Sequence, residues 1–214
     1  MPIVVGGTGF YLRALLEGLP QLPGRDESLR ERLSARENRR PGSLHRLLKR
    51  LDERAAARIH ANDTQKLIRA LEVRVLTREP APAPESAPTL ERYRALKLGL
   101  NPDRTMLYEV LDARSEEMFR SGFLEEVQSL LASGCTGEEK PFDSLGYKQA
   151  LRYVRGQVSL EEAIASTQIE TRQYAKRQWT WFRRDPEVVW LNGFGSDADV
   201  VEKADELVRK HLAA

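Results

Sequence analysis

The sequence predicts an α/β protein in which helices dominate. Three short apolar runs, at residues 2–5, 96–100 and 188–191, have the character of strands and are embedded among longer segments with helical periodicity. Hydrophobic residues make up 41% of the 214 residues, which is enough for a real core, while 31% are charged. Length and composition therefore fit one large domain, or one domain with a small insertion, with a strongly hydrated surface.

The first predicted strand comes directly before a glycine turn. Residues 2–5 include a β-branched run, residues 6–9 are Gly-Gly-Thr-Gly, and residues 10–16 have a helical pattern. This order is typical of a buried parallel strand that leads through a tight turn into a helix. The glycines could serve the turn alone, or they could let backbone N–H groups approach a phosphate. The residues leave both interpretations open.

The next part is helical and rich in charge. Residues 26–59 are predicted to be helical with a break at a Pro-Gly pair, and Ser43 is the expected N-cap after that break. A further helix is predicted over 64–76, capped by Asn62 and Asp63. The apolar face of this helix is expected to comprise Leu67, Ile68, Leu71 and Val75.

The second half begins after a proline-rich stretch at residues 80–88, which is predicted to be a stiff, extended connector. Beyond the strand at 96–100, helices are predicted over 115–133, 147–155 and 160–183, and an amphipathic helix over 196–212 closes the chain. Three short strands alone make a poor sheet for a chain of this length.

Composition excludes several classes of protein. The single cysteine, Cys135, excludes an internal disulfide and any multi-cysteine zinc site, and the three histidines show no ligand spacing. No apolar run is long enough to span a bilayer, and the start has no signal-peptide pattern. We therefore expect a soluble cytoplasmic protein. Lys and Arg exceed Asp and Glu by only two, so positive charge matters only where it is concentrated.

Positive charge is concentrated in residues 171–184, which hold five cations and four aromatics and no acidic residue. At 3.6 residues per turn, one face carries Arg172, Lys176, Trp179 and Arg183, with Arg177 and Arg184 beside it. Such a face could follow a phosphate backbone while an aromatic ring offers a surface to a base. It could equally be a solvated helix whose aromatics pack inward, and the pattern alone does not decide.

Two other segments allow both a structural and a functional interpretation. Asp112 and Arg114 could be a capping aspartate and a surface arginine, or the arginine could hold a phosphate or diphosphate. Residues 143–149 could be a helix cap with a glycine turn, or a loop that contacts a polynucleotide. Spacing does not distinguish these alternatives.

Taken together, the motifs resemble one family. Residues 2–12, 62–73, 111–114, 122–127, 146–147 and 175–183 are similar, in this order, to motifs of the tRNA dimethylallyltransferases. These bacterial tRNA isopentenyltransferases modify adenosine 37, next to the anticodon. The resemblance spans nearly the whole chain, and six ordered motifs are far more specific than any one of them.

The resemblance implies a P-loop NTPase-like parallel sheet with helices on both faces and a helical insertion. Residues 1–25 would belong to the α/β core, residues 26–60 to the insertion, and residues 61–214 to the rest of the core with its tRNA-contacting helices. The implied reaction transfers a dimethylallyl group from dimethylallyl diphosphate to N6 of a flipped-out adenine in a tRNA anticodon stem-loop. Mg²⁺ is the implied cofactor, and the full-length form would be a monomer.

The resemblance also assigns roles to residues. Thr8 is similar to a residue that lines the channel where base and allyl group meet, and Arg114 to the arginine that holds the diphosphate. The residues similar to tRNA-contacting positions are Arg30, Gln65, Lys66, Leu67, Ile68, Arg69, Phe142, Asp143, Ser144, Leu145, Gly146, Tyr147, Lys176, Arg177, Gln178, Trp179, Thr180, Trp181, Phe182 and Arg183.

The sequence departs from the family pattern at its front. The family begins with a strand, a Gly-rich loop ending in Gly-Lys-Ser/Thr, and a later aspartate that acts as general base, and this sequence has no match to them. We therefore expect an N-terminally truncated copy with incomplete sheet, little transferase activity on its own, and salt-sensitive RNA binding through residues 172–184.

Two alternatives remain at this point. A non-catalytic RNA-binding helical protein would use the same basic helix without any reaction. A nucleotide kinase-like enzyme would share the fold class, but it would have no need of the Lys-Arg-Gln-Trp-Thr-Trp helix.

Overall fold

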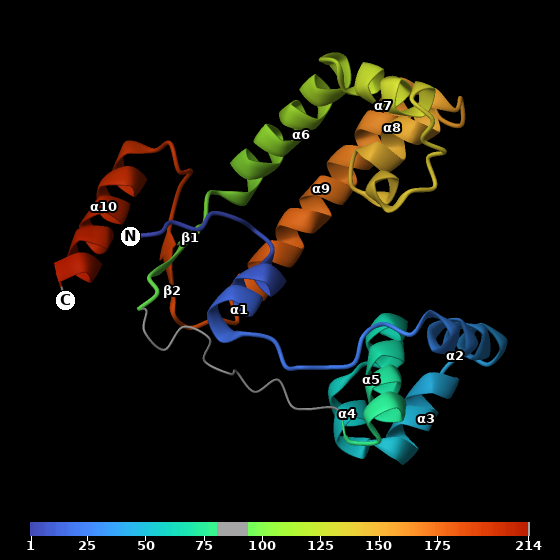
Figure 1. Cartoon of the computed structure of the whole chain (residues 1–214). Helices are drawn as coiled ribbons and strands as arrows, with labels where there is room; N and C mark the ends of the chain where they lie inside the picture. The colour runs from blue at the N-terminus through green and yellow to red at the C-terminus, as the bar shows by residue number, and fades with distance from the viewer. Residues whose placement is uncertain (81–93, 214) are drawn as a thin grey trace. The chain divides into compact units, whose positions relative to one another are not determined.

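The computed structural model describes residues 1–80 and 94–213. The chain divides into two compact units, which are described separately. Residues 1–10 and 94–214 form the α/β unit, and residues 11–93 form the helical unit. Helices dominate both (Figure 1). Helix α1 (Gly9–Glu17) starts at the end of the first segment of the α/β unit and continues into the helical unit.

The helical unit is built around a leucine core. Its helices α2 to α5 each turn apolar residues at helical spacing toward one another. The buried leucines of this core are Leu29 and Leu33 of α2, Leu44 and Leu48 of α3, and Leu67 and Leu71 of α5. The bounds of the helices are Glu27–Arg39 for α2, Ser43–Leu51 for α3, Glu53–Arg58 for α4 and Thr64–Thr77 for α5.

In the helical unit, one predicted N-cap is confirmed, and a second N-cap and one residue of a predicted apolar face are corrected. Asp63 caps α5 as expected, because its carboxylate accepts a hydrogen bond from the Lys66 N–H at 3.2 Å. Ser43, however, is the first residue of α3, and the N-cap is Gly42 in the left-handed region at φ 77°. Glu37 takes over the capping role, since its carboxylate accepts the Leu44 N–H at 2.9 Å. Val75 is 48% exposed, and the buried face of α5 continues through Val73 instead.

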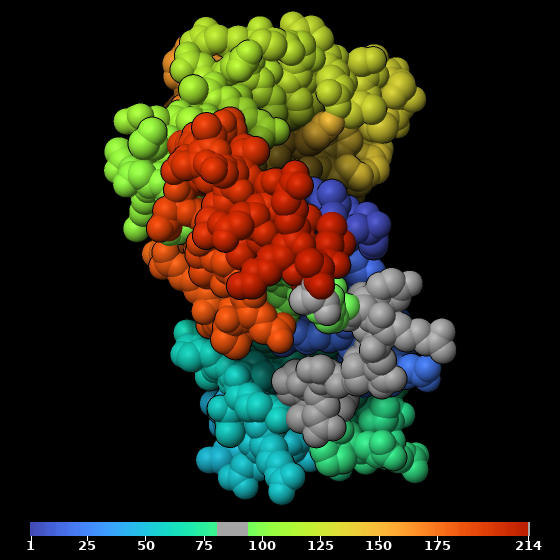
Figure 2. All heavy atoms as spheres, turned by 90° about the vertical axis from the view of Figure 1, so that its left-hand side faces the viewer, coloured from blue at the N-terminus to red at the C-terminus, as the bar shows by residue number. Residues whose placement is uncertain are grey.

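The α/β unit contains a parallel pair of strands, β1 (Lys97–Leu100) and β2 (Val188–Leu191). Lys97 pairs with Val188 and Leu100 with Leu191, so both predicted strands are confirmed. Helix α10 (Ala198–Ala213) packs near β2 and closes the chain (Figure 1). Its outer surface is open to solvent in Figure 2, where α10 is red, and Val201 is 53% exposed there.

The helices of the α/β unit gather around a second core. In Figure 1, α6 lies alongside α9, and α8 packs against α7 and α9. Aromatic residues lead this core: Phe119, Phe123 and Phe142 are buried, and the rings of Phe119 and Phe123 meet edge to face at 5.5 Å. The elements are α6 (Arg104–Arg120), α7 (Phe123–Ala132), the 3₁₀ helix η1 (Lys140–Asp143), α8 (Tyr147–Val154) and α9 (Leu160–Phe182).

The helix predicted over 115–133 is wrong in its bounds. The structure has two helices here, because Gly122 adopts φ 87° and separates α6 from α7. Helix α6 begins at Arg104 and is capped by Asp103, whose carboxylate accepts the Thr105 N–H at 2.9 Å. Asp112 therefore lies inside a helix and does not cap one.

The strand predicted at residues 2–5 is also wrong. The segment is not a strand in the structure, and Ile3 and Val5 are 76% and 91% exposed. A β-branched run becomes a strand only where a neighbouring strand supplies its hydrogen bonds. Within residues 1–80 and 94–213, the sheet consists of β1 and β2 alone.

Most of the proline-rich connector predicted at 80–88 lies outside the described residues. Over the described part of the chain, none of the helices has the length and the apolar character that spanning a bilayer requires.

Candidate nucleic-acid interface

Helix α9 divides into an acidic and a basic half. Its start is fixed by a capping box, in which Ser159 Oγ accepts the Glu162 N–H at 3.1 Å and Glu162 accepts the Ser159 N–H at 2.8 Å. Residues 160–170 contain three glutamates and no cation, and residues 171–184 contain five cations and no acid. The half that attracts phosphate is therefore confined to the C-terminal turns.

The glycine turn at residues 6–9 packs directly on this basic half. A Cβ on Gly7 would overlap the Gln178 side chain, and one on Gly9 would overlap the Trp181 indole. The rigid indole leaves no room for a side chain at position 9, whereas the flexible end of Gln178 could move aside for one at position 7. Thr8 lies between them, close to the Tyr174 hydroxyl. The hydrogen bonds of Thr8 and then Gln178 lower the pKa of the Tyr174 phenol, and the nearby Arg177 charge adds to the effect.

The basic half has two different faces. Tyr174, Gln178 and Trp181 recur on the face that meets the glycine turn. The predicted cationic face of Arg172, Lys176, Trp179 and Arg183 lies roughly on the opposite side of α9, because each residue advances about 100° around a helix. This cationic face therefore does not border Thr8. Arg177 is the cation on the Thr8 side, with its guanidinium 5.6 Å from the centre of the Tyr174 ring.

The cations of α9 differ in their partners. Arg172 pairs with the Asp112 carboxylate of α6 at 2.6 Å and lies 5.9 Å from the Tyr108 ring. The Arg183 guanidinium lies 5.9 Å from the Trp179 ring. Over residues 1–80 and 94–213, the structure shows no ion pair for Lys176, Arg177, Arg183 or Arg184. These four side chains keep their full charge for an external anion.

Arg114 lies in the middle of α6 and is exposed. The neighbouring Asp112 has one carboxylate oxygen in its ion pair with Arg172, while its Oδ1 is buried and has no hydrogen-bond partner among the described residues. The structure thus separates the two members of the Asp112–Arg114 motif, since Asp112 holds α6 to α9 and Arg114 faces solvent.

The segment 142–147 is a supported loop with an exposed middle. Phe142 is buried in the core, and Gly146 is buried at φ 92° with its N–H donated to Gln149 Oε1 at 3.0 Å. Tyr147 donates its hydroxyl to Glu126, which raises the pKa of Tyr147, and its ring meets the Phe123 ring at 5.0 Å. The side chains that this frame leaves exposed are Asp143, Ser144 and Leu145.

The predicted site residues of the helical unit have mostly structural surroundings. Arg30 and Arg69 both bind the fully buried Glu72 carboxylate, at 2.7 and 2.5 Å. Arg69 also donates to the Pro23 carbonyl at 3.0 Å. Hydrogen bonds from Arg30, and then from Arg69, lower the pKa of Glu72 to about 2.

The neighbouring positions on α5 separate into core and surface. The side chains of Leu67 and Ile68 are buried, so they hold the helix in place and offer no surface to RNA, which corrects their predicted role. Gln65 is exposed, and Lys66 is exposed beside its capping partner Asp63, at 2.5 Å.

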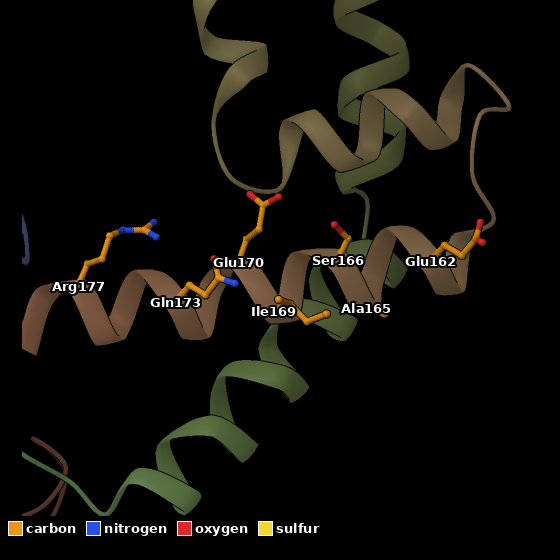
Figure 3. Close-up of a pocket in the computed structure, with 7 residues that line it drawn as sticks. All are labelled: Glu162, Ala165, Ser166, Ile169, Glu170, Gln173 and Arg177. Carbon is orange, nitrogen blue, oxygen red and sulfur yellow. The ribbon is translucent and has the colours of Figure 1, made fainter. Parts of the chain in front are cut away.

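An open groove of about 550 Å³ runs along α9 from Glu162 in the acidic half to Arg177 in the basic half. Figure 3 shows Glu170 and Arg177 directed to the same side of the helix, with Glu162 at the far end. Two carboxylates along this groove repel phosphate, so they limit how far a polyanion could extend from the basic half. The lining residues are Glu162, Ala165, Ser166, Ile169, Glu170, Gln173 and Arg177.

The Mg²⁺ implied by the resemblance has no matching ligand set here. Among the described residues, no group of three or more His, Cys, Asp or Glu side chains is placed to hold a metal ion. The Asp112 carboxylate is already paired with Arg172. The residues therefore do not fit a protein-held metal site, and no chemistry is assigned to one.

Two residues of interest were missed by sequence reasoning. Tyr174 lies two turns before Trp181 on the same helix face, a spacing that could have revealed it. Glu72 sits among buried apolar residues of α5, and a lone acid on an apolar face is a signal for a buried ion pair.

Comparison with known proteins identifies the family of the chain. A model of the IPP transferase family matches residues 1–185. The tRNA dimethylallyltransferase of Solibacter usitatus is 56% identical over 99% of this chain and 70% of its own length, and that of Koribacter versatilis is 51% identical over 98% and 69%.

Solved structures give the same result. The tRNA isopentenylpyrophosphate transferase of Bacillus halodurans is similar with a TM-score of 0.59 and 32% identity, over 95% of this chain and 64% of that one. A eukaryotic dimethylallyltransferase acting on tRNA shares the fold, with a TM-score of 0.73 at 22% identity, over 99% of this chain and 57% of that one. The predicted fold class is confirmed, and the chain belongs to the IPP transferase family.

Proposed function

We propose that this chain supplies the tRNA-binding helix and the base-lining turn of an enzyme that transfers a dimethylallyl group from dimethylallyl diphosphate to N6 of adenosine 37 in tRNA. The observation that carries this proposal is the packing of the glycine turn, with Thr8 at its centre, on the basic half of α9. The relatives named tRNA dimethylallyltransferase support the reaction class. We place the protein in the cytoplasm, as a monomer.

The reaction needs an amine brought to an allylic carbon. N6 forms the new C–N bond as the C–O bond to diphosphate breaks, and N6 then loses a proton. Thr8 is proposed to line the channel where the base meets the allyl group. The exposed Arg114 guanidinium is proposed to hold the diphosphate, because a guanidinium forks onto phosphate oxygens. Neither of these roles depends on Mg²⁺.

RNA binding is proposed to centre on the unpaired cations of α9. Lys176, Arg177 and Arg183 can each neutralise a backbone phosphate of the anticodon stem-loop, and the exposed middle of the loop 142–147 offers polar contacts. Gln178, Thr180, Trp181 and Phe182 lie on the same turns and remain proposed contacts, although Gln178 and Trp181 also pack against the glycine turn. Arg30 and Arg69 remain proposed tRNA contacts of the helical unit. Their ion pairs with Glu72 are expected to weaken their attraction for RNA phosphates.

The decisive experiment measures binding of a fluorescent anticodon stem-loop to the 214-residue chain at several salt concentrations. The triple variant Lys176→Ala, Arg177→Ala, Arg183→Ala is expected to bind about tenfold more weakly or worse. Its slope of log affinity against log salt should be shallower by about 2, because three phosphate contacts are lost at about 0.7 each.

A matched control removes three cations from α10: Lys203→Ala, Arg209→Ala, Lys210→Ala. It makes the same change in net charge away from the candidate interface, so binding should change far less. Equal losses for both triple variants would mean that only overall charge matters, and the proposed interface would be rejected.

A further inference from the structure

Tyr174 is an exposed aromatic residue whose position is fixed on several sides. Its side chain is 42% exposed, so the ring is available to a ligand. The Tyr174 hydroxyl lies close to Thr8 and Gln178. The Arg177 guanidinium lies over the Tyr174 ring, 5.6 Å from the ring centre. A ring that is exposed and yet held in place loses little conformational entropy when a ligand binds to it.

The other aromatic residue on this face has a different role. Trp181 lies two turns further along α9, and its indole is in such close contact with Gly9 that no side chain fits there. Trp181 therefore anchors the glycine turn. Tyr174 stands at the open side of the same turn, next to Thr8 and beside a cation. An aromatic ring with a nearby arginine is the arrangement on which an unstacked RNA base is commonly received.

We propose that Tyr174 is a base-contacting residue of the Thr8 site, on whose exposed ring an unstacked base of the RNA rests. Arg177 supports the same contact by placing positive charge beside the base and its phosphate. The inference rests on the proposed function, because it takes the glycine turn as the place where the base arrives. It adds a base contact to the phosphate contacts proposed for Lys176, Arg177 and Arg183.

The test compares two RNAs with three variants. Tyr174→Ala is expected to weaken binding of the intact anticodon stem-loop about tenfold, since a base stacked on an aromatic ring contributes that much or more. On a stem-loop with an abasic site at position 37, the same substitution should have almost no effect. Tyr174→Phe keeps the ring and should bind the intact RNA nearly as well as the unaltered chain. Ile169→Ala, also on exposed surface of α9, is the control and should leave binding unchanged.

An equal loss on both RNAs would overturn the inference, because Tyr174 would then contact backbone or act through folding. If Tyr174→Ala has no effect while the triple cation variant still fails to bind, the inference is wrong but the proposed function stands. If neither change affects binding, the proposed function is wrong as well.

A second measurement needs no RNA. The chain has six tyrosines, and alkaline titration of phenolate absorbance follows all of them. Thr8 and Gln178 lower the pKa of Tyr174, so Tyr174→Phe should remove a step from the low-pH side of the curve, and Thr8→Val should move that step to higher pH. If Tyr174→Phe removed a phenol from the middle or high-pH part of the curve, and Thr8→Val left the curve unchanged, the ring would not be held as described and the inference would be overturned.

Discussion

The helical unit and helix α9 are both rich in arginine, but the two regions treat the charge differently. In the helical unit, Arg30 and Arg69 converge on the buried Glu72 carboxylate, which also accepts the Asp26 N–H at 2.8 Å. On the basic half of α9, a single ion pair to a carboxylate is found within the described residues, between Arg172 and Asp112. Arginine side chains form ion pairs with a buried carboxylate in the helical unit, whereas most cations of the basic half of α9 are not paired with a carboxylate among the described residues.

This difference shows why a count of cations does not locate a nucleic-acid interface. A buried carboxylate that holds two guanidiniums offsets much of their field and ties up their hydrogen-bond donors. An arginine without such a partner keeps both for a phosphate. The position of nearby carboxylates, more than the number of arginines, therefore decides which basic segment can bind RNA.

The largest effect is expected from removing the carboxylate of the helical unit. Glu72→Gln should lower the free energy of unfolding of this unit by about 3 kcal/mol, because breaking a buried ion pair leaves charges without a partner. Urea unfolding can be followed separately for each unit. All three tryptophans lie in the α/β unit, so their fluorescence should be unaffected while the circular dichroism transition shifts.

Glu31→Gln, on the exposed surface of α2, makes the same chemical change at a carboxylate that has no ion pair within the described residues, and it serves as the control. If Glu72→Gln were no more damaging than Glu31→Gln, the ion network would contribute nothing to stability, and the contrast between the regions would fail.

The same carboxylate makes the helical unit sensitive to acid. The pKa of Glu72 is about 2 in the folded chain, below its ordinary value of 4.5. The unfolded chain therefore takes up the proton more readily, and stability should be lost as pH falls from about 4.5 to about 2, by roughly 3 kcal/mol in total. Other carboxylates with lowered pKa, among them Glu139 and Asp63, titrate in the same range. The difference between the unaltered chain and Glu72→Gln isolates the contribution of Glu72, and this difference should shrink toward pH 2.

The fold was predictable wherever a segment carries its own pattern. Apolar patterns predicted strands β1 and β2 and the long helix α9. The N-terminus of α5 was predicted from its local cap, Asp63. The strand predicted at residues 2–5 failed because strand formation depends on a partner elsewhere in the chain. The boundary between α6 and α7 was missed because Gly122 interrupts an otherwise continuous helical pattern.

The candidate site was predictable in its parts but not in its geometry. Composition located the basic half of α9, and the family resemblance located Thr8. That Thr8 meets Tyr174, on the side of the helix away from Lys176, is a tertiary fact with no local signature. The role of Asp112 as the partner of Arg172 depends equally on how α6 packs on α9, and spacing along one helix does not report it.

The smallest effect tests the rule within α9 itself. Asp112→Asn should release Arg172 from its only carboxylate partner in the described part of the chain, and RNA binding should become about twofold tighter, with a salt slope steeper by somewhat less than 1.

Glu116→Gln is the matched control, because Glu116 also lies on α6 and pairs with an arginine, Arg120, at 2.9 Å, but at the end of α6 away from the basic run. Both variants change the net charge by the same amount. If they tighten binding equally, the effect is one of overall charge, and the idea that an individual carboxylate silences an individual arginine is wrong. If only Asp112→Asn does so, the five cations of residues 171–184 are not equivalent, and RNA is bound by those that no carboxylate holds.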